Sequence, residues 1–82
     1  MRVRWTLAAA DLQSIKDYLT ERYPHLAEST VVSLYEGMRS LRASPHRGRA
    51  GRLEGTRELI FGRLPYIAAY RVKERTIEVL HI

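Results

Sequence analysis

The spacing of apolar residues changes from helical to strand-like at Ser44-Pro45, and this change limits the possible folds more than any other feature. Before it, apolar side chains recur at helical spacing in two stripes: Leu12, Ile15 and Leu19, then Ala27, Val31, Leu34, Met38 and Leu41. Pro24 separates the stripes, because proline disfavours helical geometry at the residue before it. The sequence therefore predicts two helices, the first ending around Arg22 and the second ended by Ser44-Pro45, that pack as an antiparallel hairpin.

Apolar residues follow a strand-like pattern in the other parts of the chain. Residues 2–6 form a predicted edge strand, and Thr6 at its end is expected to cap the first helix. Three more strands are predicted at residues 56–61, 66–72 and 76–82. The strand at 66–72 is apolar on both faces as far as Arg71 and should be central. The predicted fold is α+β in the order β-α-α-β-β-β, with the helical hairpin packed on a small antiparallel sheet.

The size and composition of the chain indicate one domain, residues 1–82, with a marginal core. There are 82 residues, 45% of them hydrophobic, and no cysteine, so a partner chain is the expected source of extra stability. No stretch has the apolar length of a signal peptide or a membrane span, which predicts a cytoplasmic protein without a membrane partner. Metal-ligand spacing, glycine-rich phosphate loops and triad order are absent from the sequence, so neither a metal nor a cofactor is expected.

The net charge of the chain comes from one segment. Residues 39–63 contain seven Arg and two Glu, a balance of +5, and the charges of the other residues sum to zero. Arginine suits bidentate contacts with phosphates and carboxylates, so an anionic partner is expected to meet this segment. The candidate nucleic-acid contacts are Arg47, Arg49, Arg52 and Arg63. The alternative for these loop arginines is a solvated surface.

Charged residues within the strands are the second group of candidates. Arg71 follows a central apolar run and therefore needs a partner or a ligand. Arg57 and Glu58 are strand neighbours and point to opposite faces, and Glu58 is more typical of a structural salt bridge. His81 alternates with Val79 and is expected to reach the face of Arg71, the alternative being an ordinary histidine at the end of a strand.

Several blocks of residues occur in an order that is typical of one known family. These blocks are Trp5-Thr6 with Ala10-Asp11-Leu12 and Ile15, Tyr23-Pro24 with Ala27, Leu41 before Ser44-Pro45, Gly48-Arg49 with Gly55-Thr56-Arg57-Glu58-Leu59, Pro65-Tyr66 with Tyr70-Arg71-Val72, and Ile77-Glu78-Val79-Leu80. Together they resemble the RelE/ParE-type toxins. The resemblance implies the fold predicted above and the toxin half of a bacterial type II toxin–antitoxin pair. It also implies a cognate antitoxin, partly disordered and with an acidic segment, that holds the toxin inactive in a hetero-oligomer.

The resemblance leaves the target of the toxin open. RelE-like members cleave mRNA on the ribosome without a metal, whereas ParE-like members poison DNA gyrase. The first expectation is a metal-independent mRNA endoribonuclease with Arg57, Arg71 and His81 as catalytic residues. No arginine can serve as the general base, because guanidinium does not deprotonate in proteins. The candidates are therefore Glu54, Glu58 or His81, with the Tyr70 hydroxyl nearby. The alternatives are a gyrase inhibitor that acts by binding and a non-toxic module that only binds the antitoxin.

The end of the chain departs from the family pattern. Many relatives continue past the last strand with a short segment that begins with a histidine. Here the chain stops at Ile82, about where that segment would start, and His81 lies one strand position earlier. We therefore expect a domain that lacks the family's C-terminal tail, and this form is not expected to have full toxic activity.

Overall fold

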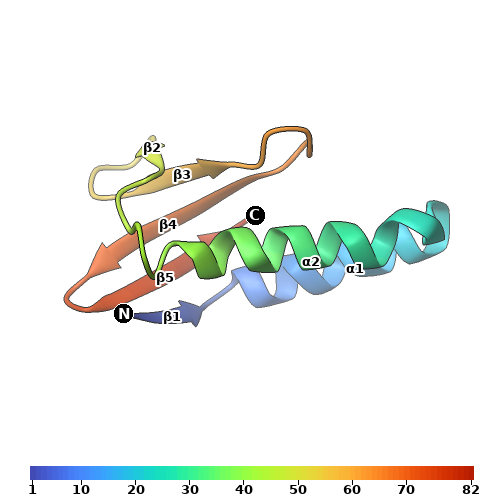
Figure 1. Cartoon of the computed structure of the whole chain (residues 1–82), viewed down its shortest axis with the longest axis horizontal. Helices are drawn as coiled ribbons and strands as arrows, with labels where there is room; N and C mark the ends of the chain where they lie inside the picture. Colours follow the sequence, from blue (N-terminus) through green and yellow to red (C-terminus); the bar gives the residue numbers. More distant parts are fainter.

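A computed structural model describes residues 1–82 and contains two helices and five strands. Their order is β1 (Arg2–Trp5), α1 (Ala8–Arg22), α2 (Pro24–Ser40), β2 (Arg49–Ala50), β3 (Arg57–Ile60), β4 (Ile67–Lys73) and β5 (Thr76–His81). The two helices lie side by side as an antiparallel hairpin, and the tip of this hairpin projects beyond the sheet (Figure 1). The predicted α+β fold, a helical hairpin on a small sheet, is confirmed, but α2 ends at Ser40, before the predicted end at Ser44-Pro45.

The strands form one sheet in the order β1-β5-β4-β3-β2, so β4 is central as predicted. Neighbouring strands are antiparallel, as predicted, except β1 and β5, which pair in parallel. β2 was not predicted from the sequence, because its two residues are too few to show alternation. Its register places Arg49 opposite Glu58 and Ala50 opposite Arg57.

The core lies between the helical hairpin and one face of the sheet. From the sheet it takes alternate residues of the three inner strands, and from the helical part it takes Ala8 and the last two residues of the second predicted stripe. Its members are Ala8, Met38, Leu41, Leu59, Ala68, Tyr70, Ile77 and Val79. Apolar burial of this kind is the main favourable term in folding. The opposite face of the sheet stays uncovered, and there Ile60 and Ile67 face each other half exposed.

Thr6 does not cap the first helix, contrary to the prediction. Its hydroxyl donates to the backbone oxygen of Val79 at 2.9 Å, and its backbone N–H donates to the same oxygen at 3.1 Å. The helix begins at Ala8, and Leu7 before it makes no side-chain capping bond. The Thr6 side chain therefore bonds to β5 at the end of the β1–β5 pair and is not available to cap the helix.

Two side chains on the covered face of the sheet, Tyr70 and Arg57, hold the Gly/Arg-rich connection between α2 and β3. The Tyr70 hydroxyl donates to the backbone oxygen of Pro45 at 2.8 Å and accepts from the Gly48 N–H at 2.9 Å. The Arg57 guanidinium donates to the backbone oxygens of His46 and Gly48 at 3.2 and 2.7 Å. Gly48 is buried, and a Cβ there would lie 2.7 Å from the Tyr70 hydroxyl oxygen, so only glycine fits. These four hydrogen bonds anchor the loop and so fix the position of the arginines that follow Gly48 in the chain.

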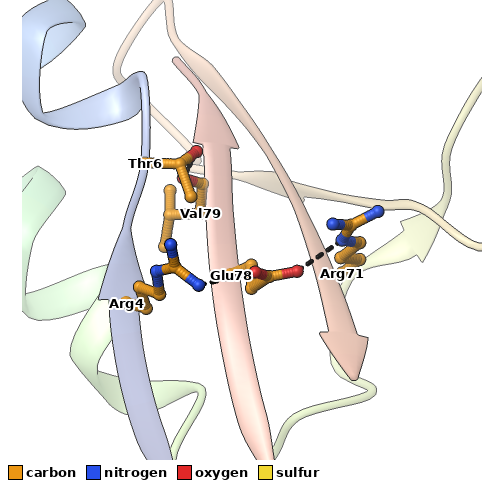
Figure 2. A network of polar contacts seen from close by, with 5 residues as sticks. All are labelled: Arg4, Thr6, Arg71, Glu78 and Val79. Atoms are coloured by element: carbon orange, nitrogen blue, oxygen red, sulfur yellow. Dashed lines mark hydrogen bonds and ion pairs between the residues drawn. The ribbon is translucent and has the colours of Figure 1, made fainter.

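A buried carboxylate joins three strands on the uncovered face. Glu78 of β5 lies between Arg71 of β4, whose Nε is 2.5 Å from Oε1, and Arg4 of β1, whose Nη1 is 3.5 Å from Oε2 (Figure 2). The hydrogen bond from Arg71 holds the pKa of Glu78 below its ordinary value, against the opposing effect of burial. Arg71 therefore has the partner that its position in the sequence required.

Replacing Tyr70 by phenylalanine should destabilise the protein. The substitution removes one hydroxyl and leaves the buried Gly48 N–H without an acceptor, which costs about 1–3 kcal/mol in the free energy of unfolding. Urea unfolding measures this loss. Tyr66→Phe is the matched control, because the Tyr66 hydroxyl makes no hydrogen bond within the chain. Equal stability of the two variants would contradict the claim that the Tyr70 hydroxyl anchors the loop.

The Glu78 ion pairs should make stability depend on pH. Because folding lowers the pKa of Glu78 from 4.5, the pairs stabilise the fold above that value, and this is lost as the pH falls through the lower folded pKa. Glu78→Gln should therefore lower the melting temperature at about pH 7, with a smaller difference from the parent at about pH 3. Glu54→Gln, at an exposed carboxylate without an ion pair, is the control. A Glu78→Gln difference that stays constant with pH would refute this account.

Candidate functional site

The arginines that are close in sequence do not form one surface in the structure. Arg39 and Arg42 lie at the end of α2 beside β1, where the Arg42 Nε donates to the backbone oxygen of Met1 at 3.2 Å. Arg57 turns to the covered face of the sheet and binds the loop backbone. The remaining arginines divide between the β2 edge and the β3–β4 turn. The concentration of charge in residues 39–63 is therefore spread over several sides of the molecule.

A hollow on the uncovered face, at the β2 edge of the sheet, holds three of the seven predicted site residues. It has a volume of about 680 Å³, and Arg49, Arg52, Glu58 and His81 are its ionisable lining residues. Arg49 and Glu58 face each other across β2 and β3, and their Nε and Oε1 atoms are 3.0 Å apart. Glu58 is thus a salt-bridge partner, and the Arg52 side chain makes no ion pair. An anion that enters this hollow would meet the Arg52 guanidinium first.

His81 reaches this hollow through an irregularity in the sheet. Ile77 and Val79 face the helices, so regular alternation would turn His81 toward the helices and away from Arg71. The register shifts between Ala69 and Tyr70, and the shift places His81 opposite Ala69 on the uncovered face. There its Nδ1 lies 3.4 Å from Oδ2 of Asp11, at the start of α1. The predicted face for His81 is observed, but the alternation used to predict it gives the wrong side.

The three residues predicted as catalytic are engaged in separate places. Arg57 binds loop carbonyls on the covered face, Arg71 pairs with Glu78, and His81 lies beside Asp11. No hydrogen bond or ion pair joins any two of them. The Tyr70 hydroxyl, the remaining group considered for proton transfer, is occupied by Pro45 and Gly48. The structure therefore does not assemble these residues into one catalytic centre.

The four predicted nucleic-acid contacts are likewise divided. Arg49 and Arg52 share the hollow at the β2 edge, and Arg47 lies exposed in the loop before it. Arg63 lies in the β3–β4 turn and lines a different hollow, an apolar groove of about 510 Å³ between this turn and the tip of the helical hairpin. Half-exposed side chains line the helical side of the groove, among them Tyr18, Tyr23 and Leu26.

Sequence reasoning missed two features of the surface. The apolar groove could not be seen, because it joins residues of both helices to a distant turn. A hollow between β1 and α2, lined by Arg2, Arg39 and Arg42, was also missed, since Arg2 is remote in sequence from the other two. No group of three or more His, Asp or Glu side chains is placed to hold a metal ion, and neither helix is long and apolar enough to cross a membrane.

Comparisons with known proteins agree with this fold. The model of the family described as the ParE toxin of the type II toxin–antitoxin system, parDE, matches residues 3–82. The candidate toxin Y4kP of Sinorhizobium fredii (strain NBRC 101917 / NGR234) is 37% identical over 82 residues, which are 99% of this chain and 84% of that protein. A solved structure of a chromosomal ParDE TA system from P. aeruginosa is similar with a TM-score of 0.89 and 35% identity, over 100% of this chain and 92% of that one. Since the family model spans nearly all residues, the chain belongs to the ParE toxin family of type II toxin–antitoxin systems, within the RelE/ParE superfamily.

Proposed function

We propose that this toxin acts on DNA gyrase by binding, without cutting RNA itself. The observation that carries the proposal is the match to the ParE family model over residues 3–82, because ParE-like members of the superfamily are the ones that poison gyrase. Ribosome-dependent mRNA cleavage, the first expectation from the sequence, has no support from this match. Both candidate targets are cytoplasmic, and we propose that location for the chain.

The arrangement of the candidate catalytic residues also favours binding over chemistry. A metal-free ribonuclease needs a base, a cationic group at the phosphorane and an acid within reach of one phosphodiester. Here Arg57 is used by the loop backbone and Arg71 by Glu78, and Glu58 is paired with Arg49. A toxin that acts by binding needs no such assembly.

mRNA cleavage stays the second candidate function because of the hollow at the β2 edge of the sheet. Arg49, Arg52, Glu58 and His81 line it together, and these side chains could stabilise a phosphate and move a proton. The assay for gyrase action must therefore include an assay for RNA.

We propose in addition that a cognate antitoxin binds the apolar groove. The relative from P. aeruginosa is part of a ParDE TA system, which supports a partner of this kind. The groove exposes Tyr18, Tyr23 and Leu26 at 49%, 48% and 45%, and apolar side chains of this size are typical anchors of protein interfaces. A segment that folds on this groove would stabilise the toxin, because it binds only the folded state.

Expression of the chain without an antitoxin tests the target. We expect gyrase-linked DNA breaks to accumulate in the expressing cells, and purified chain with purified gyrase and plasmid to yield linear DNA. Ribosome-bound mRNA from the same cells should stay uncut. Cut mRNA without DNA breaks would overturn the proposal in favour of the ribonuclease. The absence of both, together with normal growth, would leave only an antitoxin-binding module.

A charge in the groove tests the antitoxin surface. Leu26→Glu should weaken binding of the protein encoded beside this toxin about tenfold or more, since it places a charge at a buried apolar contact. Val32→Glu is the matched control, because Val32 is equally exposed on the same helix but lies outside the groove. Titration calorimetry compares the two variants. Equal losses, or no loss in either, would place the antitoxin elsewhere.

A further inference from the structure

A hollow between β1 and the last turns of α2 is the most strongly basic concave surface of this protein. It has a volume of about 420 Å³, and its charged lining residues are Arg2, Arg39 and Arg42, without a carboxylate among them. The Arg42 Nε is held by the backbone oxygen of Met1, which leaves the outer nitrogens of this guanidinium free to face the hollow. Three guanidinium groups thus surround one concave site.

These three arginines have no counter-charge within the chain. The ion pairs of the structure lie elsewhere, between Glu78 and both Arg4 and Arg71, between Glu58 and Arg49, and between Asp11 and His81. Glu36, one helical turn before Arg39, does not line the hollow and makes no ion pair with it. Like charges gathered without a counter-charge create a positive potential that an anion would lower.

The walls of the hollow are held at a fixed separation by two aromatic rings. Trp5 of β1 and Tyr35 of α2 stack with centroids 6.0 Å apart and planes at 11°. Tyr35 and Arg39 are four residues apart on α2 and lie along one side of the helix, and Arg42 follows in the turn just after its end. Arg39 thus projects from a helix that the stack joins to β1, and Arg42 is tied to the Met1 backbone, so the backbone positions of both are set before an anion binds.

The geometry points to the phosphate backbone of duplex DNA as the anion, and we propose that this hollow is a DNA contact of the toxin. The hollow presents three uncompensated guanidinium groups beside four apolar residues, Met1, Val3, Trp5 and Tyr35, of which Val3 and Trp5 are half-buried. A folding peptide needs apolar anchors, and these lie in the groove at the other end of the helices. Arginine forks match phosphate geometry, and phosphate contacts account for most non-specific affinity for DNA.

This inference rests on the proposed action on gyrase, because DNA is the substrate that gyrase holds. In the complex of gyrase with its DNA, Arg2, Arg39 and Arg42 would bind the DNA backbone beside the enzyme. The toxin would then contact both gyrase and DNA. The contact carries no sequence information, since guanidinium groups on phosphates fix position and not base identity.

The purified chain and a fluorescein-labelled DNA duplex test the contact by fluorescence anisotropy over a range of salt concentrations. Arg39→Gln/Arg42→Gln should weaken binding about tenfold or more and lower the slope of log affinity against log salt by about two. Lys16→Gln/Arg22→Gln is the matched control, because it removes the same charge from exposed positions on α1. Circular dichroism melts check that both variants fold.

Each outcome of this experiment decides the inference. A selective loss in Arg39→Gln/Arg42→Gln supports it, and equal DNA binding by the two variants overturns it. Tighter binding of single-stranded RNA or of polyglutamate through the same two arginines would assign the hollow to RNA or to an acidic protein, and would also overturn it. Failure of the gyrase proposal alone would give a different result. The parent chain would bind DNA through these arginines, but purified gyrase with the chain and plasmid would yield no linear DNA.

Discussion

The Tyr70 hydroxyl is the interaction on which the arrangement of this surface depends. It reaches from the central strand through the covered face and makes two hydrogen bonds, to the Pro45 oxygen and from the Gly48 N–H. Arg57 adds two bonds to the same loop. Because this stretch of backbone is tied to the core, β2 begins at a fixed place and Arg49 meets Glu58. A loop rich in glycine and arginine would otherwise lose much more conformational entropy when it takes one position.

The elements of the fold could be predicted from the sequence, and the roles of most site residues could not. The helical stripe ending at Met38 and Leu41, the break at Pro24 and the central position of the strand 66–72 all follow from local periodicity, which is a property of neighbouring residues. The partners of Arg57 and Arg71 depend on which strands and loops become neighbours in space. His81 shows the limit most clearly, because one register shift reverses the face that alternation predicts.

The charged groups of this protein serve two different purposes. Arg57, Arg71 and Glu78 hold the structure together, since each is bonded to a neighbouring strand or loop. Arg2, Arg39, Arg42 and Arg52 have no ion-pair partner and stay available for anions. Sequence alone counts all of these arginines equally as net charge. The structure separates the arginines that build the sheet from those that could meet a partner, and this separation favours a toxin that works by binding.

Hydrogen exchange at the Gly48 amide measures the anchor most directly. This N–H lies in a loop, and without the Tyr70 hydroxyl it would have no hydrogen-bond acceptor in the structure. We predict that in nuclear magnetic resonance it exchanges as slowly as the amides of β4, because the core must open before solvent reaches it. Exchange as fast as that of the exposed Arg52 amide would show that the loop is not tied to the core and would contradict this account.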